Sequence, residues 1–354
     1  GIWDTVSSLG MPQLGWIDDV LNIFLHHKFY NYEPQSVVNH VYHAIAIDDE
    51  RRTFWPMVWN EKKFKGKYIE QVWFPGVHSN VGGGYPRSEL STVTLDWMIE
   101  RLEGHRECFH DPDHGLHLKE DHAQEAKENA NPFGKIYDSR AGFGLLYRYQ
   151  PRPIDDLCKN KLKDNVVKVH DSALGRMKKR TAGYSPGQIP ANFDITKTRD
   201  PDDTSSIGHL RKSWVGNRIE LDKVEGENPR RKVEEFKNKR ISLYWVFLVS
   251  SIIAIAVSWD FWMNPPTMNP ESIELVSWRE ASFLNSSLGH IADFLWYVLP
   301  DFFEGAITYL VILNPIQFLG LVVYIALLYF IRFRLQDKMD DAKEEFRIKV
   351  IREI

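Results

Sequence analysis

The chain has 354 residues, a formal net charge of -4 and a pI of about 6.4, so no global basic charge suggests a nucleic-acid partner. Two cysteines cannot form a disulfide framework, and the soluble part therefore fits a reducing compartment. The chain starts at Gly1 with a strand-like pattern and no signal peptide. We therefore expect a sizeable N-terminal portion that is cleaved off or carried on a partner chain.

Three short apolar runs predict strands, at 1–6, 42–47 and 72–77. Residues 90–103, LSTVTLDWMIERLE, have apolar side chains at helical spacing, with Ser91 as a candidate N-cap. Strands that alternate with helical segments favour an α/β sheet over a sandwich. Residues 104–235 are polar and weakly periodic, and they predict an irregular extension that packs on the sheet.

Two long uncharged runs, 241–259 and 305–331, predict transmembrane helices, since a span needs about 20 apolar residues. Buried core helices are the alternative. Lys and Arg gather outside the two runs, whereas the loop 260–304 is acidic. By the positive-inside rule both termini and the N-terminal domain are cytoplasmic, and the loop is external. Within that loop, residues 290–303 predict a helix that lies in the membrane interface.

The last segment, 332–354, predicts an amphipathic helix. Its apolar residues recur at helical spacing: Leu335, Met339, Ala342, Phe346, Val350 and Ile354. This stripe either packs on the soluble domain or forms a coiled-coil seam that holds a homo-oligomer. The predicted organisation is thus a domain at 1–223, a charged linker at 224–240, a membrane hairpin at 241–331 and this helix.

The stretch FPGVHSNVGGG puts His78 just after a buried run and before three glycines. A histidine at the end of such a strand lies where α/β sheets place their sites, and glycines allow close approach to the backbone. A tight turn with a surface histidine is the alternative. A general-base histidine needs an acid to orient it. Asp4 and Asp48 each close an apolar run and could receive an imidazole N–H, although each also suits a turn.

Four blocks carry a resemblance to a known family: GIWDTVSSLGMP, YHAIAIDDERRTFWPMVW, QVWFPGVHSNVGGGYP and LSTVTLDWMIERLE. In this order they resemble an uncharacterised α/β-hydrolase family that includes phospholipase effectors of bacterial type VI secretion. VHDSALGRM and YSPGQIP resemble later blocks, so the resemblance covers roughly residues 1–190. It implies the C-terminal part of an α/β-hydrolase sheet, here followed by two transmembrane helices and the amphipathic helix.

The resemblance also implies a Ser-Asp-His triad. Its serine belongs to a G-x-S-x-G elbow upstream of the WDTV block, in a region absent from this chain. Asp4 in WDTV would be the acid and His78 in PGVHS the base, with Asp48 as the alternative acid. Relatives often have Asp two residues after the His, where this chain has Asn80.

Two other patterns invite a site. GYSPG around Ser185 matches G-x-S-x-G, but neither a strand before it nor a helix after it is predicted, so we exclude it as the elbow. A histidine-rich stretch lacks a two-plus-two metal spacing and suits a solvated loop. Its members are His105, Cys108, His110, His114, His117 and His122. We expect neither a metal nor a cofactor.

Two functions follow from these observations. The first is a membrane-anchored serine ester hydrolase that acts on a lipid or another ester, with the bilayer as partner. The second is a non-catalytic membrane scaffold that kept the fold. The residue at the elbow position before Gly1 separates them, since a serine there favours the enzyme. His78 before three glycines favours the enzyme as well.

Overall fold

This computed structural model describes residues 1–6, 34–35, 37–103, 119–141, 144, 147–196, 218–221, 229–263 and 315–354. The chain divides into two compact units. Unit 1 comprises Gly1–Lys237 together with Lys338–Ile354, and unit 2 comprises Asn238–Asp337.

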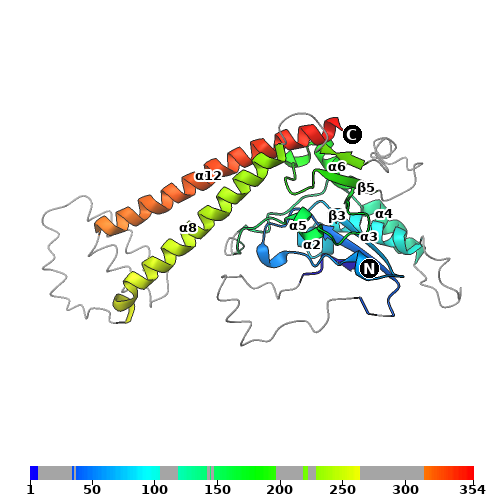
Figure 1. Ribbon diagram of the computed structural model, residues 1–354, viewed down its shortest axis with the longest axis horizontal. Coiled ribbons are helices and arrows are strands. Elements are labelled where there is room, and N and C mark those ends of the chain that lie inside the picture. The colour runs from blue at the N-terminus through cyan, green and yellow to red at the C-terminus, as the bar shows by residue number, and fades with distance from the viewer. Residues whose placement is uncertain are drawn as a thin grey trace, which may run out of the picture. The chain divides into compact units, whose positions relative to one another are not determined.

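Six strands of unit 1 form one sheet in chain order (Figure 1). They are β1 (Ile2–Trp3), β2 (His40–Ala46), β3 (Tyr68–Phe74), β4 (Val167–His170), β5 (Asn192–Thr196) and β6 (Arg218–Glu220). β1 to β5 are parallel, and β6 pairs antiparallel with β5. Parallel strands linked by helices agree with the predicted α/β class.

The predicted irregular extension, 104–235, is wrong, because regular elements occur in it. They are α4 (Glu120–Asn129), α5 (Ile154–Cys158), β4, α6 (Asp171–Lys179), β5 and β6. β4 and β5 have only four and five residues, with polar side chains inside each, so their sequences give little strand signal. Because β4 lies beside β3 in the sheet, the apolar run before His78 is an inner strand.

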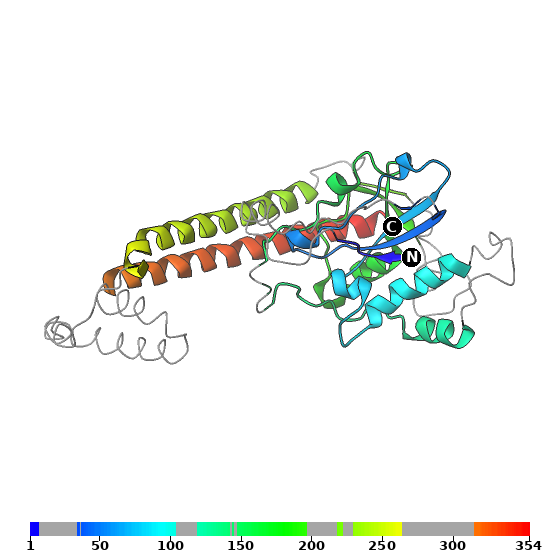
Figure 2. The same ribbon diagram turned by 90° about the horizontal axis from the view of Figure 1, so that it is seen from below.

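The two faces of the sheet carry separate cores, because side chains alternate along each strand. On one face Val72 and Phe74 pack with Trp97 of α3 (Glu89–Glu103). On the other face Trp73 belongs to the same cluster as Leu174 of α6. Each face is thus covered by a helix (Figure 2). The carboxyl ends of the strands are left for the loops that carry polar residues.

The start of α3 corrects one detail. The helix begins at Glu89, so Ser91 lies in its first turn and is not the N-cap. The Ser91 hydroxyl instead donates to the Ser88 carbonyl oxygen, at 2.9 Å.

The end of the chain belongs to the core of unit 1. Helix α12 (Pro315–Arg352) carries the predicted apolar stripe, and its residues Met339, Ala342, Phe346 and Val350 are buried. Phe346 and Val350 lie in the same core cluster as the α6 side chains. The stripe therefore packs within this chain, which is the first of the two alternatives.

Unit 2 is described only by parts of α8 (Pro229–Met263) and α12. Since α8 begins inside the predicted linker 224–240, most of that linker is helical. Of the described residues, one helix, Leu319–Arg352, is long and apolar enough to cross a membrane by length and composition. The run 241–259 is helical within α8 but is not confirmed as a membrane span. Residues 305–314 of the other predicted run lie outside the described residues, as does the predicted loop helix 290–303.

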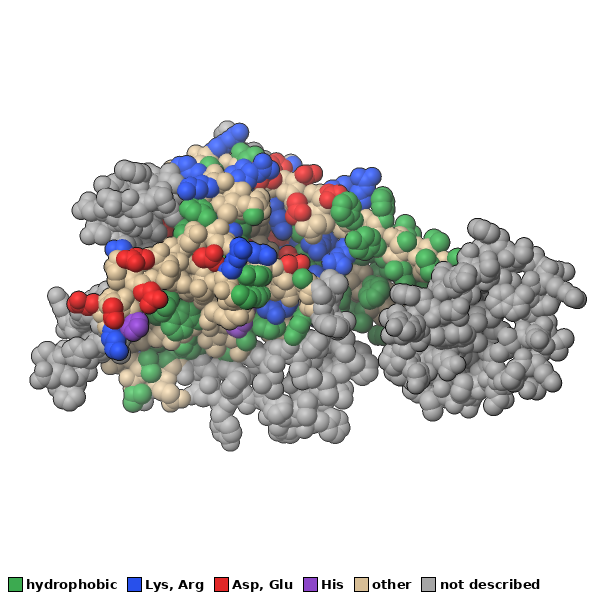
Figure 3. Space-filling view, turned by 180° about the vertical axis from the view of Figure 1, so that it is seen from behind, with side chains coloured by type: hydrophobic (Ala, Val, Ile, Leu, Met, Phe, Trp, Pro, Cys, Tyr) green, Lys and Arg blue, Asp and Glu red, His purple; other side chains and the backbone are tan. Residues whose placement is uncertain are grey.

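Hydrophobic side chains stand on the surface of both helices (Figure 3). Examples are Phe247 and Ile253 of α8, at 49% and 56% exposed, and Val323 and Phe330 of α12, at 66% and 54%. A hydrogen bond of 2.8 Å from the Tyr324 hydroxyl to the Ser250 hydroxyl joins the helices. Such a contiguous apolar surface is typical of a helix that contacts lipid or another protein.

The loop after β3 needs glycine for two different reasons. Gly76 has φ +115°, and a Cβ there would lie 2.5 Å from the Cβ of Asn80. Gly83 and Gly84 also have positive φ, at +89° and +111°, but no described atom lies closer than 4.0 Å to a Cβ built at either residue. The positive φ therefore explains Gly83 and Gly84, whereas the sequence analysis expected close approach to their backbone.

Candidate active site

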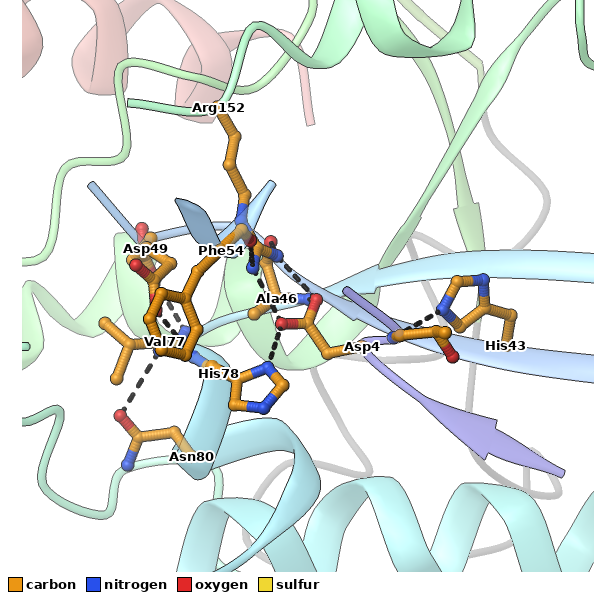
Figure 4. A network of polar contacts seen from close by, with 12 residues as sticks. Asp4, His43, Ala46, Asp49, Phe54, Val77, His78, Asn80 and Arg152 are labelled. Carbon is orange, nitrogen blue, oxygen red and sulfur yellow. Dashed lines mark hydrogen bonds and ion pairs between the residues drawn. The ribbon is translucent and has the colours of Figure 1, made fainter. Parts of the chain in front are cut away.

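Asp4 lies one residue beyond β1 and is completely buried. Its Oδ1 accepts the Ala46 N–H at 2.9 Å. Arg152 donates to both oxygens, from Nη1 to Oδ1 at 2.5 Å and from Nη2 to Oδ2 at 2.7 Å (Figure 4). The residue has φ +40°, a left-handed conformation that costs energy for a residue with a Cβ. Pairing and backbone together fix the direction of this carboxylate.

His78 is the first residue of the short helix α2 (His78–Gly82), which follows β3. Its Nδ1 lies 2.7 Å from Asp4 Oδ2, and its backbone N–H donates to Asp49 Oδ2 at 3.1 Å. The ring of Phe54 packs edge-on against the imidazole, with 5.3 Å between ring centroids (Figure 4). The imidazole is thus held on one side by an acid and on the other by an aromatic ring.

The free nitrogen of this imidazole is the reactive atom of the arrangement. An ionised Asp4 can only accept, so Nδ1 carries the proton and Nε2 has the lone pair. Within the described part of the chain Nε2 has no hydrogen-bond partner, and the His78 side chain is 30% exposed. Nε2 can therefore take a proton from a nucleophile beside it.

Arg152 sets the charge of the acid. Burial would raise the pKa of Asp4, but the charge and hydrogen bonds of Arg152, followed by the hydrogen bond and charge of His78, outweigh it. They hold the pKa of Asp4 well below its usual range. Arg152 also donates to the carbonyl oxygens of Ala46 and Phe54, and so it ties the acid to β2 and to the aromatic wall.

Asp48, the alternative acid, does not contact His78. Its Oδ2 accepts the Gly76 N–H at 2.6 Å and the Tyr184 hydroxyl at 3.0 Å. Burial raises its pKa to about 6, against the opposing effects of the Gly76 and Tyr184 hydrogen bonds. Of the two candidate acids, the structure brings Asp4 to the imidazole and leaves Asp48 apart from it.

Two residues of this network were missed from the sequence. Arg152 stands in a Pro-rich stretch, QPRPID, that has no periodic pattern. His43, inside β2, is fully buried, and its Nε2 accepts the Thr5 N–H at 3.2 Å. Burial lowers the pKa of His43 to about 4, so it is neutral and supports the turn after Asp4. Arg152 could have been recognised only from its burial beside an acid, and a sequence does not show whether a loop residue is buried.

The described serines do not complete the site. The Ser185 hydroxyl donates to the Lys343 carbonyl oxygen at 2.5 Å, and the 3-10 turn Thr181–Gly183, not a strand, precedes it. Ser7 and Ser8 lie outside the described residues, as does the histidine-rich stretch apart from His122. Among the described residues, no group of three or more His, Cys, Asp or Glu side chains could hold a metal ion.

Comparison with known families gives one match. Residues 1–101 match the family model described as "T6SS, Phospholipase effector Tle1-like, catalytic domain". This confirms the resemblance to the type VI secretion phospholipase effectors over the part that holds Asp4, Asp48 and His78. Comparisons with curated proteins and with solved structures gave no match. The family match supports a hydrolase of the phospholipase kind.

Proposed function

We propose that this chain supplies the base and the acid of a serine ester hydrolase that acts on phospholipids. The observation that carries the proposal is the 2.7 Å contact between His78 Nδ1 and a buried Asp4, with Nε2 left free on a partly exposed imidazole. Asp4 and His78 follow parallel strands at the carboxyl edge of the sheet, where α/β folds place their sites. The family match over the same residues supports the substrate class.

In this proposal His78 activates a serine hydroxyl. Nε2 takes the hydroxyl proton as the serine oxygen attacks the ester carbonyl, and Asp4 stabilises the imidazolium that forms. The imidazolium then gives its proton to the leaving alcohol, and an acyl-enzyme remains. A water molecule, deprotonated by the same Nε2, releases the fatty acid and restores the serine. We place this serine before Asp4 in the complete protein, either upstream in the same chain or on a partner chain.

We also propose that the enzyme is anchored in a bilayer by two helices, with both termini and the hydrolase domain on the cytoplasmic side. The exposed apolar surface of α12 supports the anchor. The basic residues that flank both predicted spans support the orientation. Anchoring raises the effective concentration of a lipid substrate at the site.

Hydrolysis of phospholipid vesicles by the full-length protein tests the proposed function. His78→Ala should lower the rate by a factor of about 10³ or more. Asp4→Asn should lower it at least tenfold more than Asp48→Asn does, because only Asp4 contacts the imidazole. His122→Ala removes an exposed imidazole outside the network and is the matched control.

Retained activity in His78→Ala would overturn the assignment of the base. A larger loss in Asp48→Asn than in Asp4→Asn would overturn the assignment of the acid. A wild-type protein without any esterase activity would favour the scaffold function.

A further inference from the structure

A second polar cavity opens at the same edge of the sheet and does not contain His78. It has a volume of about 880 Å³, within the range of small-molecule sites. Asp48 after β2, Arg176 of α6, Tyr184 and Lys343 of α12 are among the residues that line it. All of them belong to unit 1.

Arg176 has unused hydrogen-bonding capacity in this cavity. The residue is 1% exposed. Its Nη1 donates to the carbonyl oxygens of Pro132 and Gly134, at 2.6 and 2.7 Å. Its Nε is buried without a partner, and Nη2 has none within the described part of the chain. Because Nε is closed to solvent, the guanidinium can meet a phosphate or a carboxylate in the cavity through Nη2.

Asp48 offers the opposite charge in the same cavity. Its Oδ2 is occupied by the Gly76 N–H and the Tyr184 hydroxyl, whereas Oδ1 accepts no hydrogen bond from the described residues. The Tyr184 ring also packs against the Arg176 guanidinium, with 5.1 Å from Cζ to the ring centroid. Tyr184 thus separates the two charges, and no ion pair joins them. The cavity wall therefore holds one hydrogen-bond donor without an acceptor, Arg176 Nη2, and one acceptor without a donor, Asp48 Oδ1, among the described residues.

Lys343 adds positive charge on the same side. Its side chain is 15% exposed, and it forms a long ion pair, of 3.7 Å, with the exposed Asp340. Lys343, Arg176 and Asp48 line the same cavity. The wall also carries further charges of both signs, so it favours a ligand that is itself zwitterionic. These are the acids Glu50, Asp138, Asp340, Asp341 and Glu344 and the bases Arg87, Lys135 and Arg180.

The cavity is also connected to the proposed catalytic histidine. Tyr137, in its wall, donates its N–H to the Asn80 side-chain oxygen at 3.4 Å. Asn80 Nδ2 donates to the carbonyl oxygen of Lys135, another wall residue, at 3.1 Å. Asn80 stands in α2, two residues after His78. Asn80 of α2 thus holds Lys135 and Tyr137 in the cavity wall, and a ligand in the cavity contacts the same segment.

We propose that this cavity binds the headgroup of a zwitterionic aminophospholipid, with the phosphate at Arg176 Nη2 and Lys343 and the ammonium group at Asp48 Oδ1. The choice of a phosphate over a carboxylate rests on the proposed phospholipid hydrolysis. Asp48 is then a binding residue and not a member of the triad.

Titration calorimetry on the full-length His78→Ala protein tests this assignment, because binding can be measured without hydrolysis. The probes are sn-glycero-3-phosphoethanolamine, sn-glycero-3-phosphoglycerol, which lacks the amine, and inorganic phosphate. We expect the phosphoethanolamine probe to bind at least tenfold more tightly than the other two. Absence of binding, or equal affinity for all three probes, would overturn the proposal, whether or not the wild-type protein is a hydrolase.

Three substitutions in the same background locate the site. Asp48→Asn should reduce the tenfold preference for the amine to less than threefold, because it removes the carboxylate. Lys343→Met should weaken both phosphodiester probes about fivefold while keeping the side-chain stem that packs in the wall. Lys349→Met changes a lysine of the same helix outside the cavity and should leave binding unchanged. Affinities that the first two substitutions leave unaltered would place the probes elsewhere.

Discussion

Arg152 is the residue on which the geometry of the proposed dyad depends. It is fully buried, and both of its terminal nitrogens contact Asp4, which lies 148 positions away in the chain. A buried carboxylate with a bidentate arginine stays ionised and cannot rotate, so it presents Oδ2 to the imidazole in one orientation. The same cation offsets part of the charge that would stabilise an imidazolium.

Replacement of Arg152 should therefore change the charge of the acid as well as the rate. In Arg152→Met the pKa of Asp4 should rise, because burial raises it and the charge of Arg152 no longer opposes burial. The rate should also fall about tenfold as Asp4 loses its fixed orientation. Arg152→Lys should restore the low pKa of Asp4, measured by carboxyl NMR titration, but only part of the rate. A loss of rate with the pKa of Asp4 unchanged would mean a purely structural role.

The sequence predicted both partners of the dyad, but its apolar pattern left two acids open and only the resemblance favoured Asp4. Asp4 and Asp48 both follow an apolar run and precede a polar turn. The register decides between them, since Trp3 lies opposite Ala44 and Asp4 is therefore level with the interior of β2. Asp48 stands beyond the end of that strand. Strand register depends on tertiary pairing, and a single sequence does not contain it.

At the scale of elements, the end of α12 is part of the hydrolase core and not an appendage. Its apolar spacing was recognised from the sequence, but periodicity alone does not tell what covers a stripe. Phe346 is completely buried in the cluster that also holds Trp73 and Leu174. The Arg347 guanidinium donates to the Met177 carbonyl oxygen at 2.7 Å and ties this helix to α6.

Truncation of the buried aromatic ring should measure this contribution. Phe346→Ala should lower the free energy of unfolding of unit 1 by about 3–5 kcal/mol, because it removes a fully packed side chain and leaves a cavity. Ile348→Ala, on the same helix but 39% exposed, should cost less than about 1 kcal/mol. Chemical unfolding of the full-length protein followed by tryptophan fluorescence gives both values. Equal effects of the two substitutions would contradict the placement of this helix.

The elements missed from the sequence share a physical cause. β4 and β5 are short, and each carries a lysine or an aspartate within the strand, so neither produces an apolar run. Their stability comes from pairing with longer neighbours, beginning with Val72 opposite Lys168. Longer runs such as Tyr68–Phe74 and Glu89–Glu103 carry enough apolar residues at regular spacing to be recognised from the sequence.

At the scale of the whole molecule, two buried groups act on stability in opposite directions over about pH 4–6. The pKa of His43 is lowered from 6.5 to about 4, so the unfolded chain binds more protons and stability is lost as the pH falls. The pKa of Asp48 is raised from 3.8 to about 6, so the folded chain binds more protons and stability is lost as the pH rises. The two contributions cancel in part.

Asp48→Asn should remove the contribution of Asp48 to the pH dependence of stability and leave that of His43. The variant should gain stability relative to the wild type, on the order of 2 kcal/mol, as the pH is raised from 4 to 7. Its own stability should fall on acidification below pH 6.5, where His43 begins to take up a proton on unfolding. Unfolding free energies of both proteins at closely spaced pH values test this, and parallel curves would contradict it.

The most direct test of the account is active-site labelling of the full-length natural protein with a fluorophosphonate, followed by peptide mapping. We expect one labelled serine, on a peptide that precedes Asp4 or on a partner chain, and loss of the label in a folded His78→Ala protein. No label in intact protein, or a label that His78→Ala leaves unchanged, would contradict it. His78 would then belong to a fold that keeps the geometry of the site without its catalytic activity.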